Sequence, residues 1–116
     1  MEETVFLSGD LAERLSALRK NRQSCLMLNE QQIPLVSKIT IGRDRKNSIV
    51  VPDGMVSHFH AVIQKIKDDY YIKDLGSTNG TFVNNLELPE GNYVKLESND
   101  TIRIGRTDLT LVLRKD

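Results

Sequence analysis

Residues 101–113 read TIRIGRTDLTLVL, and apolar and polar side chains alternate in both halves of this stretch. In residues 101–104 and again in residues 109–113, every second position is an isoleucine or a leucine. Alternation with a period of two places successive side chains on opposite faces of a β-strand. The stretch therefore predicts two strands that each bury one face.

The same signal recurs in both directions from this stretch. Turn-forming residues such as Asp68-Asp69 and Asn84-Asn85 separate the runs. A single sheet could not bury so many apolar positions on one face. We therefore predict an all-β fold, a β-sandwich of two mostly antiparallel sheets. Besides the two strands above, the runs that predict strands are residues 25–28, 38–41, 49–51, 60–66, 70–75, 81–83 and 93–96.

The first 22 residues have a different pattern. Leu11, Leu15 and Leu18 follow the i, i+4, i+7 spacing of one helix face, which predicts a short N-terminal amphipathic helix. A helix of about a dozen residues is marginal alone, so we expect it to pack on the domain or on a partner. We expect residues 1–22 to form a tail with this helix, and residues 23–116 to form the β-domain.

Composition limits the classes of function. The chain has 116 residues and a formal net charge of zero, so no global field attracts nucleic acid or an anionic membrane. Cys25 is the one cysteine, which excludes an intrachain disulfide framework. No apolar run approaches the roughly 18 residues of a membrane span, and the start MEETVF is unlike a signal peptide. We expect an intracellular protein.

Enzyme motifs are weak. There is no phosphate loop of the GxxxxGK[ST] type. Ser57 and His60 lie three residues apart without a carboxylate at a telling spacing, and His58 with His60 lacks a third metal ligand. We expect neither catalysis nor a cofactor nor a metal site. Three further carboxylates are scattered along the chain and show no acid–base pairing: Asp44, Asp53 and Asp74.

Three segments at predicted strand ends carry the chemistry of an anion site. They are Gly42-Arg43, residues 56–60 (VSHFH) and residues 76–82 (GSTNGTF). Together they offer a guanidinium fork, hydroxyls, imidazoles and glycine-rich backbone, which suit a phosphate dianion. Each alone is more often a surface charge, a core histidine or a turn. The sequon Asn79-Gly80-Thr81 matters only in secreted proteins.

The order and spacing of these segments, GR-x13-SxxH-x15-GSTNGTFVN, resembles the forkhead-associated (FHA) domain, and residues 47–50 (NSIV) also match its pattern. The resemblance extends from about Cys25 to Leu113. It implies a β-sandwich that binds phosphothreonine peptides through loops at one end, as a protein–protein interaction module in kinase signalling.

The resemblance also implies roles for single residues. Arg43 and Ser57 match the phosphate-binding residues of the family, and Thr78 matches a second hydroxyl at the phosphate. Asn79 matches the residue that binds the ligand's main chain. His58 stands where the family often has Arg, Lys or Asn, so we expect binding to tighten as pH falls toward 6. The residues that match loop supports are Gly42, His60, Gly80 and Asn84.

The implied partners are phosphothreonine-containing proteins, with an upstream Ser/Thr kinase. Thr4 follows two glutamates and resembles the phosphorylated tails of small bacterial FHA regulators, so it is a candidate phosphoacceptor that binds its own domain or another copy. The basic loop Arg45-Lys46-Asn47 suggests an acidic flank in the ligand. The alternatives are a phosphate-independent scaffold or oligomerisation domain that docks through the N-terminal helix, and, more weakly, nucleic-acid binding.

One short repeat needs an interpretation. Ile41-Gly42-Arg43 and Ile104-Gly105-Arg106 are identical tripeptides, but the flanking residues do not extend the match. We interpret them as two strand ends of similar chemistry, and not as a repeat architecture.

Overall fold

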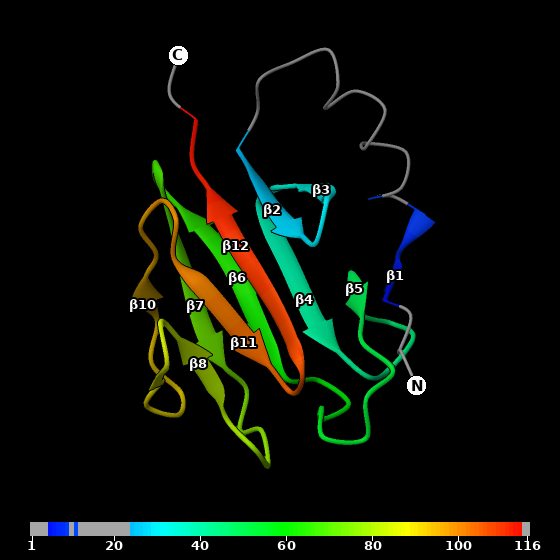
Figure 1. Ribbon diagram of the computed structural model, residues 1–116. Coiled ribbons are helices and arrows are strands. Elements are labelled where there is room, and N and C mark those ends of the chain that lie inside the picture. Colours follow the sequence, from blue (N-terminus) through cyan, green and yellow to red (C-terminus); the bar gives the residue numbers. More distant parts are fainter. Residues whose placement is uncertain (1–4, 10, 12–23, 115–116) are drawn as a thin grey trace.

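The strands of the computed structural model, which describes residues 5–9, 11 and 24–114, form two sheets (Figure 1). Sheet A contains, in spatial order, β1 (Phe6–Leu7), β5 (Ile49–Val50), β4 (Lys38–Gly42), β6 (Ala61–Ile66), β7 (Asp69–Asp74) and β10 (Val94–Lys95). Sheet B contains β3 (Gln31–Pro34), β2 (Cys25–Leu28), β12 (Thr107–Val112), β11 (Thr101–Ile104), β8 (Thr81–Val83) and β9 (Leu86–Glu87). The predicted all-β sandwich is confirmed.

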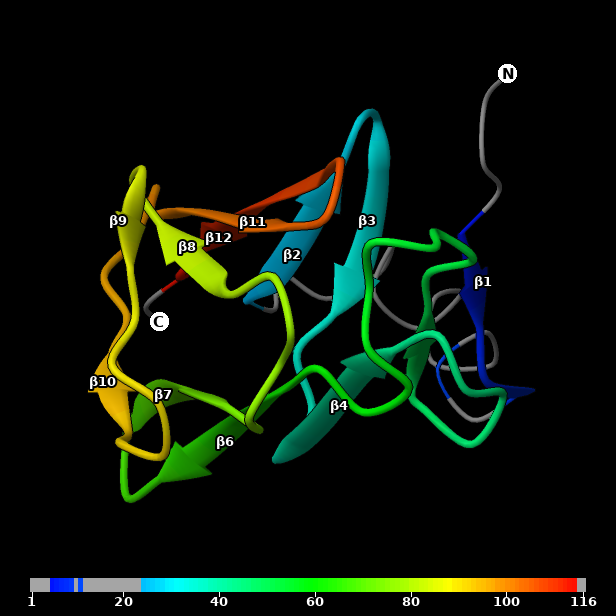
Figure 2. The same ribbon diagram turned by 90° about the horizontal axis from the view of Figure 1, so that it is seen from below.

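The sheets are mostly antiparallel, as predicted. The pair formed by β4 and β5 is parallel, and it brings Gly42 opposite Val50. The view from below in Figure 2 shows β4, β6 and β7 on one side of the molecule and β2, β12, β11 and β8 on the other. Connections between the two sheets therefore have to cross at the ends of the sandwich, where loops from both sheets meet.

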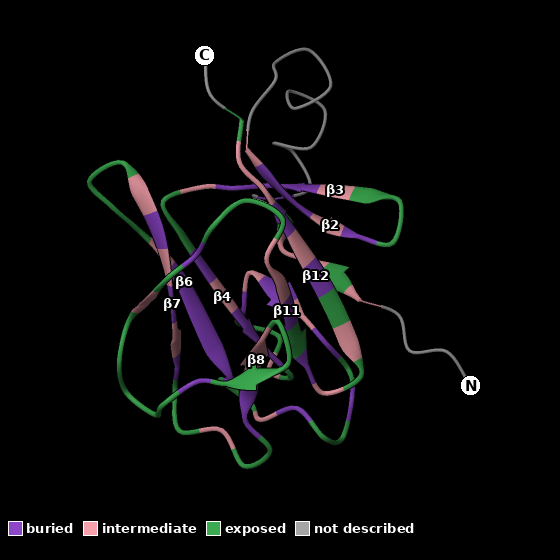
Figure 3. Cartoon of the chain, turned by 60° about the vertical axis from the view of Figure 1, so that its left-hand side comes forward, coloured by how far each residue is buried: buried purple, intermediate pink, exposed green. Residues whose placement is uncertain are grey.

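The core lies between the sheets. Rows of directly paired residues point inward, such as Ile39, Ile63 and Ile72 in sheet A and Ile102 with Leu109 in sheet B, and all five are fully buried. Burial of each such side chain contributes about 1.5–3 kcal/mol relative to exposure. Figure 3 shows buried residues along β4, β6, β11 and β12, and many exposed residues in the loops. The apolar positions that alternate in the sequence point into the core, and the polar positions between them point toward solvent.

The N-terminal segment adds a strand that the sequence did not predict. β1 pairs with the edge strand β5, with Phe6 opposite Val50 and Leu7 opposite Ile49. Gly9 and Leu11 are helical, and Leu11 is 1% exposed and belongs to the core. The rest of the predicted helix, Asp10 and residues 12–23 with Leu15 and Leu18, lies outside the described residues, as does Thr4.

All nine strands expected from the sequence are present, and the described residues contain three further short strands that were not predicted. β1 and β9 have two residues each, and β3 is polar at its start and ends in a proline. Such strands carry no alternation long enough to read. β3 and β9 pair with the strands directly before them, β2 and β8, in hairpins. β1 pairs with the distant edge strand β5, which only the tertiary structure brings beside it.

Candidate functional site

The three segments singled out in the sequence meet at one end of the sandwich. Arg43 follows β4, Ser57 lies between β5 and β6, and Thr78 lies between β7 and β8. These connections gather at the lower end of the molecule in Figure 1, together with the turn between β11 and β12. The three segments are far apart in the sequence. They come together because β5, β4, β6 and β7 are neighbours in sheet A.

Arg43 is anchored to the connection between β5 and β6. Its backbone N–H donates to the Ser57 carbonyl at 2.9 Å, and its side-chain Nε donates to the Val56 carbonyl at 3.0 Å. The residue is nevertheless exposed. The Nε bond fixes the plane of the guanidinium. Its remaining N–H groups therefore form a preorganised fork that can donate to the oxygens of a planar or tetrahedral anion.

Gly42 allows this close approach. A Cβ at this position would lie 2.2 Å from the His58 carbonyl oxygen and 2.8 Å from Nδ2 of Asn47. Nδ2 of Asn47 donates to the carbonyls of Asp44 at 2.8 Å and His58 at 2.7 Å. Asn47 is 1% exposed, and these bonds fasten the two connections to each other behind Arg43.

His60 ties two loops together from inside the protein. Its Nδ1 accepts the backbone N–H of Ser57 at 3.1 Å, so the neutral ring carries its proton on Nε2, which donates to the Gly80 carbonyl at 2.8 Å. The ring is fully buried. One imidazole therefore sets the distance between the Ser57 segment and the GSTNG loop.

The exposed groups of the two loops also contact each other. The backbone N–H of Thr78 donates to Oγ of Ser57 at 3.1 Å, and Nδ2 of Asn79 donates to the Met55 carbonyl at 2.8 Å. Thr78 and Asn79 are exposed. The structure therefore brings Arg43, Ser57, Thr78 and Asn79 into one network, with a hydroxyl and an amide oxygen at its surface.

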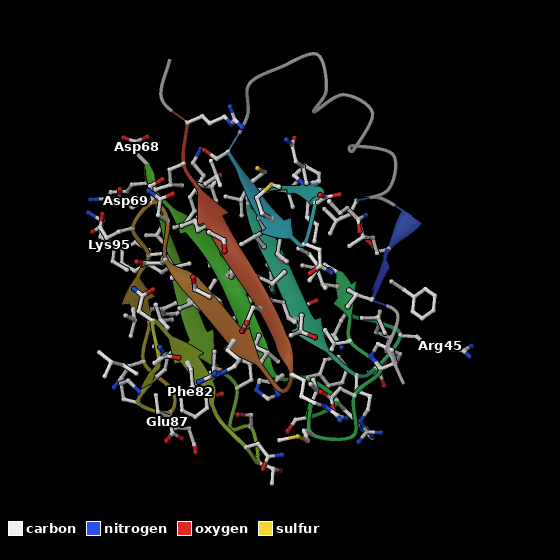
Figure 4. The ribbon with its side chains drawn as sticks, viewed as in Figure 1. Arg45, Asp68, Asp69, Phe82, Glu87 and Lys95 are labelled. Carbon is white, nitrogen blue, oxygen red and sulfur yellow. The ribbon has the colours of Figure 1, made fainter. Side chains whose placement is uncertain are left out.

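The other expected residues lie as follows. His58 is exposed, and within the described chain its ring forms no hydrogen bond, whereas its carbonyl accepts from Asp44 N–H at 3.1 Å. The side chain of Arg45 points away from the sandwich into solvent (Figure 4). Asn84 does not join these loops. It braces the turn after β8, where its Nδ2 donates to Asp100 at 2.8 Å and its Oδ1 accepts from Thr101 N–H at 3.0 Å.

Asp74 shapes the GSTNG loop, a role that the sequence did not reveal. Its Oδ2 accepts the N–H groups of Gly76 and Ser77 at 3.0 Å each, and its Oδ1 accepts the hydroxyls of Ser77 at 2.6 Å and Thr81 at 2.7 Å. Burial, the largest single influence, raises the pKa of this carboxyl, but these four hydrogen bonds together outweigh it and lower the pKa. Asp74 is therefore a buried carboxylate held ionised by its loop.

Asp53 has a similar role in the connection between β5 and β6. Its Oδ1 accepts Met55 N–H at 2.9 Å, and the Arg106 side chain donates to it with Nη2 at 3.1 Å from Oδ1. The hydrogen bonds from Arg106 are the main cause that lowers the pKa of Asp53 to about 2. Asp44 likewise accepts Lys46 N–H at 2.8 Å.

The three aspartates therefore cap loops at the candidate site. Their scattered positions in the sequence show no acid–base pairing, and this capping role was not predicted. The available signal was the tendency of Asp to accept the backbone N–H two residues later in a turn. Asp44, Asp53 and Asp74 all make that bond.

No group of three or more His, Cys, Asp or Glu side chains in the described part of the chain is arranged to hold a metal ion. No helix among the described residues has the length and apolar character needed to cross a membrane.

Comparison with known proteins points to one family. The family model described as FHA domain matches residues 39–105. Protein FraH from Nostoc sp. is 40% identical over 91 residues, which cover 71% of this chain and 31% of FraH. The chain spans less than half the length of the first curated relatives it matches.

Two solved structures show the same likeness. The MEK1 FHA domain in complex with a HOP1 phosphothreonine peptide superposes with a TM-score of 0.71 and 30% identity, covering 79% of this chain and 97% of that domain. EmbR of Mycobacterium tuberculosis, in complex with a low-affinity phosphopeptide, has a TM-score of 0.74 and 28% identity, covering 90% of this chain and 30% of EmbR. Both similar structures hold phosphorylated peptides.

Proposed function

This chain belongs to the FHA domain family, and we propose that it is a phosphothreonine-dependent protein-binding module and not an enzyme. The observation that carries the proposal is the network of Arg43, Ser57 and Thr78. An exposed guanidinium, held by its Nε at 3.0 Å from the Val56 carbonyl, lies beside two hydroxyl residues whose segments are hydrogen-bonded to each other at 3.1 Å. Such a network suits a phosphate dianion, which is present on a partner only after a kinase has added it.

Each polar group has a proposed role in the bound state. The guanidinium of Arg43 and the hydroxyls of Ser57 and Thr78 donate to the phosphate oxygens. Because Nδ2 of Asn79 is engaged by the Met55 carbonyl, its Oδ1 is oriented as an acceptor for a main-chain N–H of the ligand. The exposed imidazole of His58 stands beside Ser57 and adds positive charge when protonated.

The magnitudes fit a reversible contact. A hydrogen bond to a charged group contributes about 1.5–3 kcal/mol net. Three or four of them, less the cost of ordering a peptide, give a complex in the micromolar range, near −8 kcal/mol. Without the phosphate these charge-assisted hydrogen bonds are lost and the binding free energy is close to zero. Phosphorylation of the partner therefore switches binding on. This is why we propose that the partners are phosphothreonine-containing proteins inside the cell, downstream of a Ser/Thr kinase.

The test begins with a library of phosphothreonine peptides on the immobilised protein, followed by calorimetry with a selected peptide and its unphosphorylated form. Arg43→Ala should weaken phosphopeptide binding by roughly a hundredfold or more, because it removes the charged fork. Arg103→Ala is the matched control, since this exposed arginine lies over the Phe82 ring on sheet B, 5.4 Å from its centre. Wild-type affinity in Arg43→Ala would refute the proposed site.

We further propose that Thr4, once phosphorylated, is a ligand of this site in the same chain or in another copy. β1 runs antiparallel to β5, and β5 runs parallel to β4, so the start of β1 faces the end that carries Arg43. Phe6 is opposite Val50, which is opposite Gly42, so Phe6 is about 10 Å from Gly42 at a strand spacing of 4.7–4.9 Å. Thr4 is two residues from Phe6, which adds a reach of up to ~7 Å.

Binding of an external phosphopeptide to the protein with and without phosphate on Thr4 tests this. Self-recognition predicts weaker external binding in the phosphorylated form, and equal affinities would eliminate it. The scaffold alternative, which docks through the leucine stripe, is weakened by Leu11, whose side chain is buried in the core of its own domain. In the scaffold alternative, the docking surface would have to consist of Leu15 and Leu18 without Leu11.

A further inference from the structure

The two identical tripeptides of the sequence contact the same loop. Ile41-Gly42-Arg43 ends β4 in sheet A, and Ile104-Gly105-Arg106 follows the end of β11 in sheet B. Both approach the segment of residues 53–58, here called the ligand loop, at the lower end of Figure 1. The function proposed above uses the first tripeptide and leaves the second without a role.

The second tripeptide grips the ligand loop by Asp53. The backbone N–H of Arg106 donates to Oδ2 of Asp53 at 3.0 Å, and its side chain donates with Nη2 at 3.1 Å from Oδ1 and Nε at 3.4 Å from Oδ2. Gly105 makes this approach possible, because its φ is +60° and a Cβ there would lie 2.7 Å from Asp53 Oδ2 and from Val56 Cγ2. Asp53 is 1% exposed, whereas the Arg106 side chain is 67% exposed.

Asp53 in turn organises the ligand loop. Its carboxylate accepts Met55 N–H at 2.9 Å, and its carbonyl accepts Val56 N–H at 2.9 Å. The carbonyls of these two residues are the atoms that hold the site: the Met55 carbonyl accepts from Asn79, and the Val56 carbonyl accepts from Arg43 Nε. Met55 and Val56, whose carbonyls orient Asn79 and Arg43, are thus each bonded to Asp53 through their own backbone N–H groups.

We infer that the Asp53–Arg106 pair is a positioning element of the phosphopeptide site, which couples the turn after β11 in sheet B to the orientation of Arg43 and Asn79. The inference rests on the proposed function. Burial of the charged Asp53 carboxylate is costly unless its hydrogen-bond donors stay in place. The ligand loop is therefore held in the arrangement that brings Met55 N–H and Arg106 to this carboxylate. Neither residue needs to touch the peptide, because both act through the carbonyls of the ligand loop.

The test compares the full chain with its Asp53→Asn and Arg106→Met variants. Arg106→Met removes the ion pair while the backbone bond to Asp53 remains, so it keeps the inference testable if Asp53→Asn does not fold. Both variants should bind the selected phosphothreonine peptide at least about tenfold more weakly at a temperature where they are folded. The matched control is Asp69→Asn, which breaks the exposed pair with Lys95 (3.7 Å) toward the other end of sheet A (Figure 4).

A second readout separates positioning from stability alone. The NMR signal of the Arg43 Nε–H group reports its bond to the Val56 carbonyl, and it should shift in both variants of the pair but not in Asp69→Asn. Arg106→Lys, which retains the charge, should recover part of the affinity. Wild-type affinity and an unmoved Nε–H signal in Arg106→Met, with Arg43→Ala still inactive, would overturn the positioning role and leave the proposed function intact. Unchanged binding by Arg43→Ala would overturn both.

Discussion

Nε2 of His60 and the carbonyl oxygen of Gly80 are 2.8 Å apart, so one buried ring joins two loops that lie 20 residues apart in the sequence. The other ring nitrogen accepts Ser57 N–H at 3.1 Å. The relative position of the Ser57 hydroxyl and the Thr78 backbone therefore depends on a side chain that no ligand can reach. The interior of the protein therefore positions the two loops of the proposed phosphate site.

His60→Ala should destabilise the fold. It removes two hydrogen bonds and leaves a buried N–H and a buried carbonyl without partners, which costs about 1–3 kcal/mol for each group. We expect the free energy of unfolding in urea to fall by about 2–6 kcal/mol from these two groups, and loss of packing adds to this. His58→Ala is the control, because this exposed ring should change stability by no more than ~0.5 kcal/mol. Equal effects of the two variants would contradict the bridging role of His60.

Gly42→Ala should be strongly unfavourable. The new Cβ would lie 2.2 Å from the His58 carbonyl oxygen, a backbone atom, so the connection that carries Ser57 has to move. Overpacking of this kind costs about 1–3 kcal/mol. Thermal unfolding and phosphopeptide affinity should both decline. Gly54→Ala provides the comparison, because nothing lies within 4 Å of a Cβ there. Wild-type stability of Gly42→Ala would show that the backbone at Gly42 and the His58 carbonyl are not tightly packed.

Acid should weaken the protein through Asp53. Its pKa is lowered from 3.8 to about 2 in the folded state, chiefly by the Arg106 side chain. A carboxyl with a lowered pKa stabilises the fold fully above its unfolded pKa, and the contribution is lost as pH falls through the folded value. At 1.36 kcal/mol per pH unit the shift corresponds to about 2 kcal/mol, lost between roughly pH 4 and pH 2.

Urea unfolding across this range checks the assignment to Asp53. The difference in unfolding free energy between the wild type and Asp53→Asn should be constant near neutral pH and should shrink below about pH 4. A difference that stays constant down to pH 2 would assign the acid sensitivity to other groups. Asp74, whose pKa is also lowered in the fold, is the next residue to examine in that case.

The pH dependence of binding tests His58. Protonation of this exposed imidazole beside Ser57 adds a positive charge, so phosphopeptide affinity should rise as pH falls from 7.5 toward 6, while the phosphate remains largely dianionic. Because the phosphate has its own second pKa near 6, the comparison with His58→Gln is essential. Calorimetric titrations of both proteins across this range should give diverging profiles. Identical profiles would mean that His58 faces solvent in the complex.

Much of the fold could be read from local sequence. The alternation in residues 101–104 and 109–113 reports burial on one face, and both segments became strands β11 and β12. β1 could not be read, because Phe6–Leu7 has no periodicity and forms a strand only against the edge of β5. The leucine spacing predicted that the N-terminal segment packs on the domain or on a partner, and only the tertiary structure showed that Leu11 packs into the core of this domain.

The candidate site divides in the same way. The sequence alone was enough to name the residues proposed to face the ligand, Arg43, Ser57, Thr78 and Asn79, because their order and spacing resemble the FHA pattern. Only the tertiary structure decided what holds them. Asp53 and Arg106 meet across 53 residues, and each looks like an ordinary surface charge until the two sheets bring β11 against the ligand loop. A hydrogen bond between distant segments depends on strand order and sheet packing, and neither is written in the local pattern of the chain.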